Sequence, residues 1–120
     1  MTRQSYFQKG SPFSEWLRKQ PEIDSKLGYV TTDIDYVWRD YNTGLFLLIE
    51  EKCKMGEPEY SQMETFRALN KSIESDNYRG IHLVQFENTS PDDGAVFLDR
   101  KEITKQELLD FLRFKFEEPE

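Results

Sequence analysis

The chain has 120 residues, of which 37% are hydrophobic and 14% aromatic, so it can bury one core and does not belong to the class of disordered proteins. Its formal net charge of −7 at pH 7 argues against a broad nucleic-acid-coating surface, although a small site can still meet phosphate through metal ions. One cysteine excludes an internal disulfide, and no apolar run resembles a membrane span or a signal peptide, so we expect one cytoplasmic domain over residues 1–120.

The N-terminal segment predicts a short helix after a lead-in. Residues 1–12 are polar and end in Gly-Ser-Pro, which predicts a mobile stretch of chain. Ser14 is the expected N-cap of a helix over residues 15–20, and Pro21 stops that helix.

Two strand-like runs follow the helix. Residues 29–38 and 45–53 are rich in strand-forming residues, and the loop between them carries Asn42 and Gly44, which predicts a hairpin. Residues 45–49 are apolar without alternation, which is typical of a central strand that is covered on both faces.

The second half of the chain alternates helix and strand signals. We expect a helix over residues 61–75 with Ser61 and Glu64 as a capping box, a strand over 81–87, a short strand over 95–98, and a helix opened by Thr104 and Glu107. The first of these helices is long enough to cross over between parallel strands. The order of elements predicts an α/β or mixed α+β fold with helices packed on one sheet.

Charged side chains gather at the adjoining ends of the two hairpin strands. Asp33 and Asp35 open the first strand, and Glu50 and Lys52 close the second; residues two apart in a strand share a face. An antiparallel pairing brings these ends together. Two or three carboxylates beside one ammonium suit a hard divalent cation and an activated water.

These residues, in this order, resemble the PD-(D/E)XK nuclease superfamily, which has the restriction-endonuclease-like fold. The resemblance spans residues 13–87: Asp35 starts a strand, Glu50 and Lys52 form the E-x-K at the end of the next, and a helix and a further strand follow. Ile34 stands where the motif has proline. The resemblance implies a single-domain mixed central sheet flanked by helices, and a nuclease that hydrolyses nucleic acid, with DNA expected, using Mg²⁺ or Mn²⁺.

The resemblance also implies a role for each motif residue. Asp35 and Glu50 are expected to hold the metal, and Lys52 to orient or activate the attacking water and to stabilise charge on the phosphate. Asp33 is the rival for the motif acid, because it precedes Asp35 by two residues and shares its face. Asp35 is favoured, since the apolar start of the strand follows it directly.

Three further residues have expected positions around this site. Some branches of the superfamily add a Glu from the first helix, for which Glu15 is the candidate, and some add a Gln after the E-x-K, for which Gln62 is the candidate. Glu51, between the two motif residues, is expected to face the other way, toward solvent or a helix.

Purely structural interpretations compete with these roles. The acidic side chains and the lysine could form cross-strand salt bridges on a solvated face. His82 lies among apolar strand residues and is expected to be a core histidine with satisfied hydrogen bonds, and the chain has no second histidine for a zinc site. Cys53 is expected to be a buried structural thiol.

Two functional hypotheses follow from the sequence. The first is a small Mg²⁺-dependent endonuclease or exonuclease of viral or mobile-element type with weak sequence specificity. A homodimer of such a domain would place two sites on two strands. The second is a catalytically silent copy of the fold that binds a protein partner and modulates a larger nucleic-acid machine. The acidic charge favours the second hypothesis, and the intact motif favours the first.

Overall fold

The computed structural model describes residues 11–115, and backbone contacts divide the chain into two compact units with their boundary between Asp33 and Ile34. Most of the predicted lead-in, residues 1–10, lies outside the described residues, whereas Ser11 and Pro12 already belong to the start of the first helix. The expectation of one domain over residues 1–120 stays a prediction.

The first unit consists of short helical segments. Helix α2 (Pro12–Arg18) begins earlier than the sequence predicts, because the Ser11 side chain accepts a hydrogen bond from the Ser14 N–H at 3.3 Å and Pro12 takes the first helical position. The predicted N-cap, Ser14, is therefore wrong; this residue lies inside the helix, where its hydroxyl accepts a hydrogen bond from Arg18 at 3.2 Å. The 3-10 turns that follow are η1 (Pro21–Ile23) and η2 (Ser25–Leu27).

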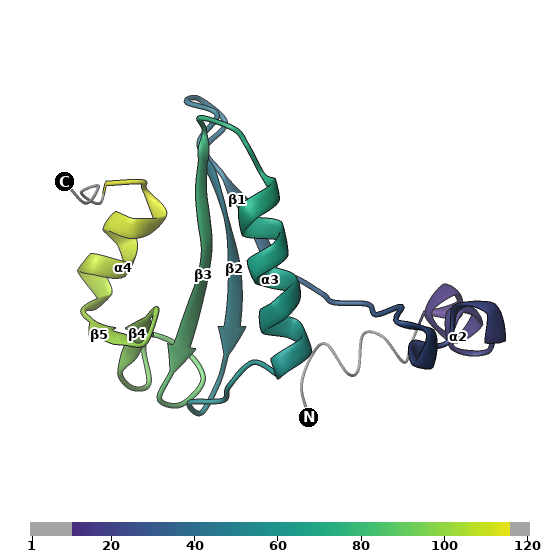
Figure 1. The fold of residues 1–120 in the computed structure, drawn as a ribbon. Helices are drawn as coiled ribbons and strands as arrows, with labels where there is room; N and C mark the ends of the chain where they lie inside the picture. Colours follow the sequence, from purple (N-terminus) through teal and green to yellow (C-terminus); the bar gives the residue numbers. More distant parts are fainter. Residues whose placement is uncertain (1–10, 116–120) are drawn as a thin grey trace. The chain divides into compact units, whose positions relative to one another are not determined.

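The second unit is built on a mixed sheet with the strand order β1-β2-β3-β4-β5. Its strands are β1 (Tyr36–Arg39), β2 (Phe46–Lys52), β3 (Tyr78–Phe86), β4 (Val96–Leu98) and β5 (Lys101–Ile103). β1 and β2 form the predicted antiparallel hairpin, and helix α3 (Tyr60–Ser72) crosses over so that β3 runs parallel to β2 (Figure 1). The predicted class, one sheet flanked by helices, is confirmed.

The first strand is much shorter than predicted. β1 begins at Tyr36, whereas the sequence predicts a strand from residue 29. At the residue before β1, a side-chain oxygen of Asp35, and not a main-chain carbonyl, accepts the hydrogen bond of the Glu51 N–H at 2.8 Å. The ladder of main-chain hydrogen bonds between β1 and β2 therefore ends at the point where the Asp35 side chain accepts the hydrogen bond from Glu51.

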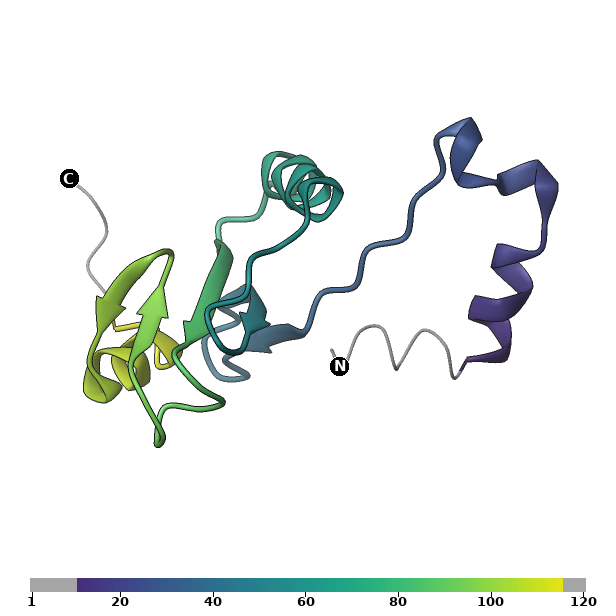
Figure 2. The same cartoon turned by 90° about the horizontal axis from the view of Figure 1, so that it is seen from below.

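Helices α3 and α4 (Lys105–Leu112) cover opposite faces of the sheet (Figures 1 and 2). The face toward α4 carries the hydrophobic core, which consists of Leu47, Ile49, Val84, Phe86, Val96, Leu108 and Phe111. Alternation along β2 directs Leu48 and Glu50 to the other face, toward α3 and its buried Phe66. No helix within residues 11–115 is long and apolar enough to cross a membrane.

The sequence predicts the start of helix α4 correctly, but it does not predict the start of helix α3. At α4 the predicted capping box is present: the Thr104 hydroxyl accepts the Glu107 N–H at 3.0 Å, and the Glu107 carboxylate accepts the Thr104 N–H at 2.8 Å. At α3 the predicted cap at Ser61 is wrong, because the helix starts after Glu59. Gln62 closes its first turn by accepting the Glu59 N–H at 3.3 Å.

Candidate active site

The acidic end of the β1–β2 hairpin brings the predicted motif residues together. In the register of this pair Tyr36 lies opposite Ile49, so Asp35, one residue earlier, comes opposite Glu50. Side chains directly opposite each other in an antiparallel pair lie on the same face of the sheet. Lys52 lies two residues beyond Glu50 on β2 and shares that face, which is the face toward α3.

Glu50 is the centre of this cluster, and its side chain is only 1% exposed. Its Oε2 atom accepts a hydrogen bond from Gln62 Nε2 at 2.8 Å and lies 3.4 Å from Lys52 Nζ. Its Oε1 atom is buried as well, and no hydrogen-bond donor in the described part of the chain reaches that atom. The α3 helix and the end of β2 thus hold one oxygen of a buried carboxylate through a hydrogen bond and an ion pair.

The electrostatics of the cluster work against a charged Glu50. Burial, followed by the nearby negative charge of Asp35, raises the pKa of Glu50 from 4.5 to about 7, and the attraction of Lys52 and the hydrogen bond from Gln62 only partly oppose this. The Asp35 carboxylate is therefore close enough to Glu50 to disfavour its charged form. Glu50 therefore carries a proton through part of the neutral pH range, and a cation at the site would favour its release.

The other predicted site residues have different outcomes. Gln62 lies in the cluster through its hydrogen bond to Glu50. Glu51 points away from the cluster, as predicted, and accepts a hydrogen bond from the Tyr36 hydroxyl at 2.8 Å. Glu15 and Asp33 both belong to the first unit and are described only within it, so their supporting roles remain predictions.

The solvated-face interpretation is wrong for Glu50 and Lys52. Glu50 is buried, and the Lys52 side chain is only 16% exposed, so this ion pair lies under α3 and not on an open surface. Burial makes the pair far more consequential than a surface salt bridge, because desolvated charges interact strongly with their surroundings.

Gln85 is a site residue that the sequence analysis missed. It lies beside Lys52 in the register of β2 and β3 and is 1% exposed. Its Nε2 atom donates to the Gly56 carbonyl at 2.9 Å and to Glu57 at 3.2 Å, so it fixes the turn that leaves β2 just after the E-x-K residues. An amide between the apolar residues Val84 and Phe86, near the end of β3, is the signal that could have identified it.

His82 and Cys53 test the two remaining structural expectations. Both ring nitrogens of His82 have partners, Asp99 Oδ2 at 2.7 Å and the Arg79 carbonyl at 2.7 Å, so the expected satisfied core histidine is confirmed. The expected buried thiol is wrong: β2 ends at Lys52, and Cys53 lies exposed in the turn that follows.

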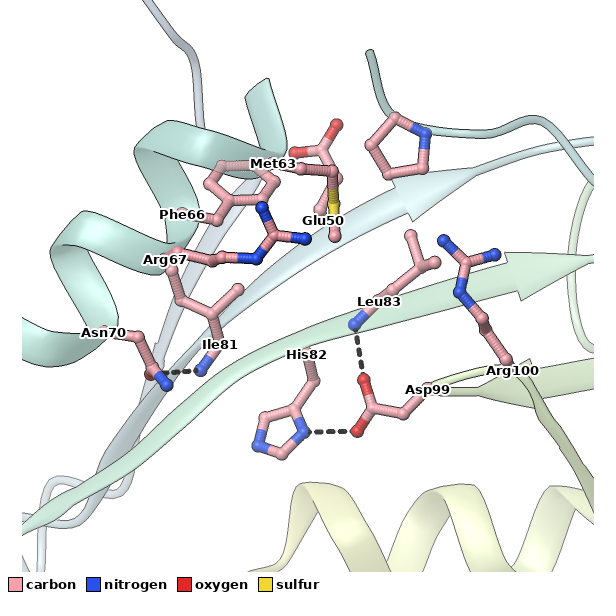
Figure 3. A pocket seen from close by; sticks show the side chains of 11 residues that line it. Glu50, Met63, Phe66, Arg67, Asn70, Ile81, His82, Leu83, Asp99 and Arg100 are labelled. Atoms are coloured by element: carbon pink, nitrogen blue, oxygen red, sulfur yellow. Dashed lines mark hydrogen bonds and ion pairs between the residues drawn. The ribbon is translucent and has the colours of Figure 1, made fainter. Parts of the chain in front are cut away.

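A pocket of about 230 Å³ opens beside Glu50, between α3 and β3 (Figure 3). Its lining combines apolar side chains with two arginines, one from α3 and one from the turn between β4 and β5. Its lining includes Met63, Phe66, Arg67, Leu83 and Arg100. The buried carboxylate therefore borders a space that a small ligand group can enter.

The donor set of the site fits a hard cation with few protein ligands. No group of three or more His, Cys, Asp or Glu side chains among residues 11–115 is arranged to hold a metal ion. The cluster offers the two carboxylates of Asp35 and Glu50. Mg²⁺ commonly takes one or two protein carboxylates and completes its shell with water and substrate phosphate, so this pair suits Mg²⁺ and does not suit zinc.

Comparison with known proteins adds no family to these observations, since no protein-family model, curated protein or solved structure matches the chain. The resemblance to PD-(D/E)XK nucleases thus remains a prediction from the motif residues.

Proposed function

We propose that this chain is a metal-dependent nuclease that hydrolyses phosphodiester bonds of nucleic acid, with DNA as the expected substrate. The observation that carries the proposal is the convergence of Asp35, Glu50 and Lys52 at one end of the β1–β2 hairpin. A carboxylate with a perturbed pKa beside a specific charged partner, as at Glu50, is typical of functional sites.

Asp35 and Glu50 are the residues that would hold Mg²⁺ or Mn²⁺. Burial and, second, repulsion from Asp35 raise the pKa of Glu50, and a divalent cation would offset that repulsion. Such an ion would offset negative charge on a phosphate and would activate a bound water as the nucleophile.

The chain's own residues orient and complement this chemistry. Gln62 donates to Glu50 Oε2 from the first turn of α3 and so fixes the orientation of the carboxylate. Lys52 holds a half-buried ammonium 3.4 Å from the same oxygen. This ammonium can donate to a phosphate oxygen as negative charge builds on it, which is the stabilisation that a preorganised cation supplies best in a site shielded from water.

A cleavage panel tests the proposal. Purified protein is incubated with single-stranded, double-stranded and branched DNA and with RNA, in Mg²⁺, in Mn²⁺ and in excess EDTA. We expect the protein to cleave at least one substrate, and we expect this cleavage to require the metal and to be lost in Lys52→Ala. The control Lys71→Ala, which removes an exposed lysine from α3, should cut normally. Cleavage that persists in EDTA, or that Lys52→Ala retains in full, would contradict the assignment.

A second candidate function is binding of a protein partner by a catalytically silent copy of the fold. The net charge of −7 favours it, because such a surface repels nucleic acid over most of its area. Partner binding becomes the better-supported function if the protein cleaves no substrate of the panel while it still binds the metal. A homodimer remains compatible with both functions, and sedimentation of the full chain distinguishes it from a monomer.

A further inference from the structure

The pocket beside Glu50 has apolar walls of a kind that receive a flat ring. Met63 and Phe66 enter it from α3, and Leu83 enters from β3 (Figure 3). At about 230 Å³ it is smaller than the usual site for a drug-sized ligand, so it suits one ring system and not a longer molecule. An apolar wall with an aromatic and a thioether side chain is favourable for stacking.

Two arginines line the same pocket, together with the acidic side chains of Glu50 and Asp99. Arg67 extends from α3 and Arg100 from the turn between β4 and β5, and Figure 3 shows Arg67 next to Phe66 and Arg100 beside β3. Their ion pairs within the chain, Arg67 with Glu64 at 3.8 Å and Arg100 with Glu57 at 2.6 Å, lie on exposed side chains. Exposed pairs contribute little, so both guanidinium groups can turn toward an anionic or aromatic ligand.

The apolar walls and the two guanidinium groups suit a nucleotide, which combines a flat base with a negative phosphate. A guanidinium plane stacks on a nucleobase, and its charge attracts the phosphate that is attached to the same nucleotide. The pocket also borders Glu50, so a base in it lies next to the position where the proposed chemistry acts on phosphate.

We infer that this pocket receives the base of an unpaired nucleotide, and that this nucleotide is adjacent to the phosphate that is cut. The position next to the cut phosphate rests on the proposed nuclease function. A base that is paired in a duplex lies in the stack and cannot enter until it is extruded. The chain therefore prefers single strands, frayed ends or flaps to continuous duplex.

Binding without cleavage tests the pocket directly. The full chain, kept in EDTA, is titrated into a short fluorescein-labelled single-stranded DNA and, separately, into a strand of equal length in which every base is replaced by an abasic sugar. Both strands carry the same phosphate charge, so the ratio of their dissociation constants reports the bases alone. We expect the strand with bases to bind at least about fivefold more tightly, as stacking of one base commonly provides.

Matched variants assign this preference to the pocket. Arg67→Ala and Met63→Ala should bring the ratio toward one, whereas their controls Lys71→Ala and Leu109→Ala, at exposed positions outside the pocket lining, should leave it unchanged. A wild-type ratio of one overturns the inference, and so does an equal ratio in Arg67→Ala, Met63→Ala and both controls, because the bases would then contact another surface.

The cleavage panel keeps the two proposals apart. A base preference that depends on Arg67 and Met63, in a protein that cuts no substrate, supports the pocket and contradicts the nuclease. Metal-dependent cleavage with no base preference supports the nuclease and contradicts the pocket. When both hold, cleavage of single-stranded DNA should exceed cleavage of the same strand in a duplex.

Discussion

Glu50→Gln should stabilise the metal-free protein at pH 8, although it removes the central residue of the candidate site. The difference between a pKa of 4.5 and one of about 7 corresponds to about 3 kcal/mol, since one pKa unit is worth about 1.4 kcal/mol. Glutamine has nearly the same shape, carries no charge and keeps an oxygen for the hydrogen bond from Gln62. Lys52 loses its partner, which subtracts from the gain, so we expect a net increase of about 1–3 kcal/mol in the free energy of unfolding.

The same change should flatten the pH dependence of stability. In metal-free wild type, the folded chain keeps a proton on Glu50 up to about pH 7, whereas the unfolded chain releases it near 4.5. Between these values the folded state binds more protons, so stability falls as pH rises and levels off above about pH 7. Glutamine has no proton to release, and this fall should be absent from the variant.

Urea unfolding in EDTA at a series of pH values measures both effects. Glu51→Gln is the matched control, because the neighbouring side chain points the other way and is half-exposed; its effect should stay within about 1 kcal/mol. Two results would refute the argument that the buried, charged carboxylate of Glu50 lowers the free energy of unfolding. One is a Glu50→Gln protein that is less stable than wild type at pH 8, and the other is a variant whose stability falls with pH between 5 and 7 as steeply as that of wild type.

Three further predictions concern the metal, the lysine and the histidine. Mg²⁺ or Mn²⁺ should raise the Tm of wild type, because it binds only the folded state, and the increase should vanish in Asp35→Asn and in Glu50→Gln; scanning calorimetry measures it. Lys52→Ala should keep the fold and the metal-dependent rise in Tm while cleavage falls by about 10²–10³-fold in a gel assay. Burial lowers the pKa of His82, but the hydrogen bonds to Asp99 and to a main-chain carbonyl raise this pKa by more. The protonated His82 therefore stabilises the fold below pH 6.5, and this stabilisation is lost as pH rises through the pKa of His82 in the folded state. Asp99→Asn should therefore cost more stability below pH 6.5 than at pH 8, as measured by urea unfolding.

The parts of the fold that the sequence predicts correctly are those with local causes. The hairpin follows from two strand-forming runs around a turn with Gly44, whose φ of +82° suits glycine. The unbroken apolar run of β2 predicts burial on both faces, and the structure confirms it. Thr104 and Glu107 cap α4 through contacts within one turn, which is why their spacing alone identifies the start of the helix.

The parts that the sequence does not predict depend on contacts between distant segments. The first strand shortens because Asp35 bonds the main chain of Glu51, sixteen residues away, in place of a ladder hydrogen bond. β5 is a short and mostly exposed strand whose residues have no strand-forming pattern, and it forms by pairing with β4. Gln85 matters through a turn that lies far from it in sequence. The pKa of Glu50 depends on α3 covering it, which no spacing along β2 reveals.

A purely structural ion pair is the strongest competing explanation for the cluster, and it predicts the opposite electrostatics. An ion pair that stabilises a fold lowers the pKa of its carboxylate. Lys52 pulls in that direction, yet burial and the second carboxylate outweigh it and the pKa of Glu50 rises to about 7. Well-packed apolar residues commonly replace a buried pair of this kind without loss of stability, so stability alone does not account for two acids that meet under α3. We propose that a further cation makes the arrangement favourable, as a site for Mg²⁺ and phosphate would do.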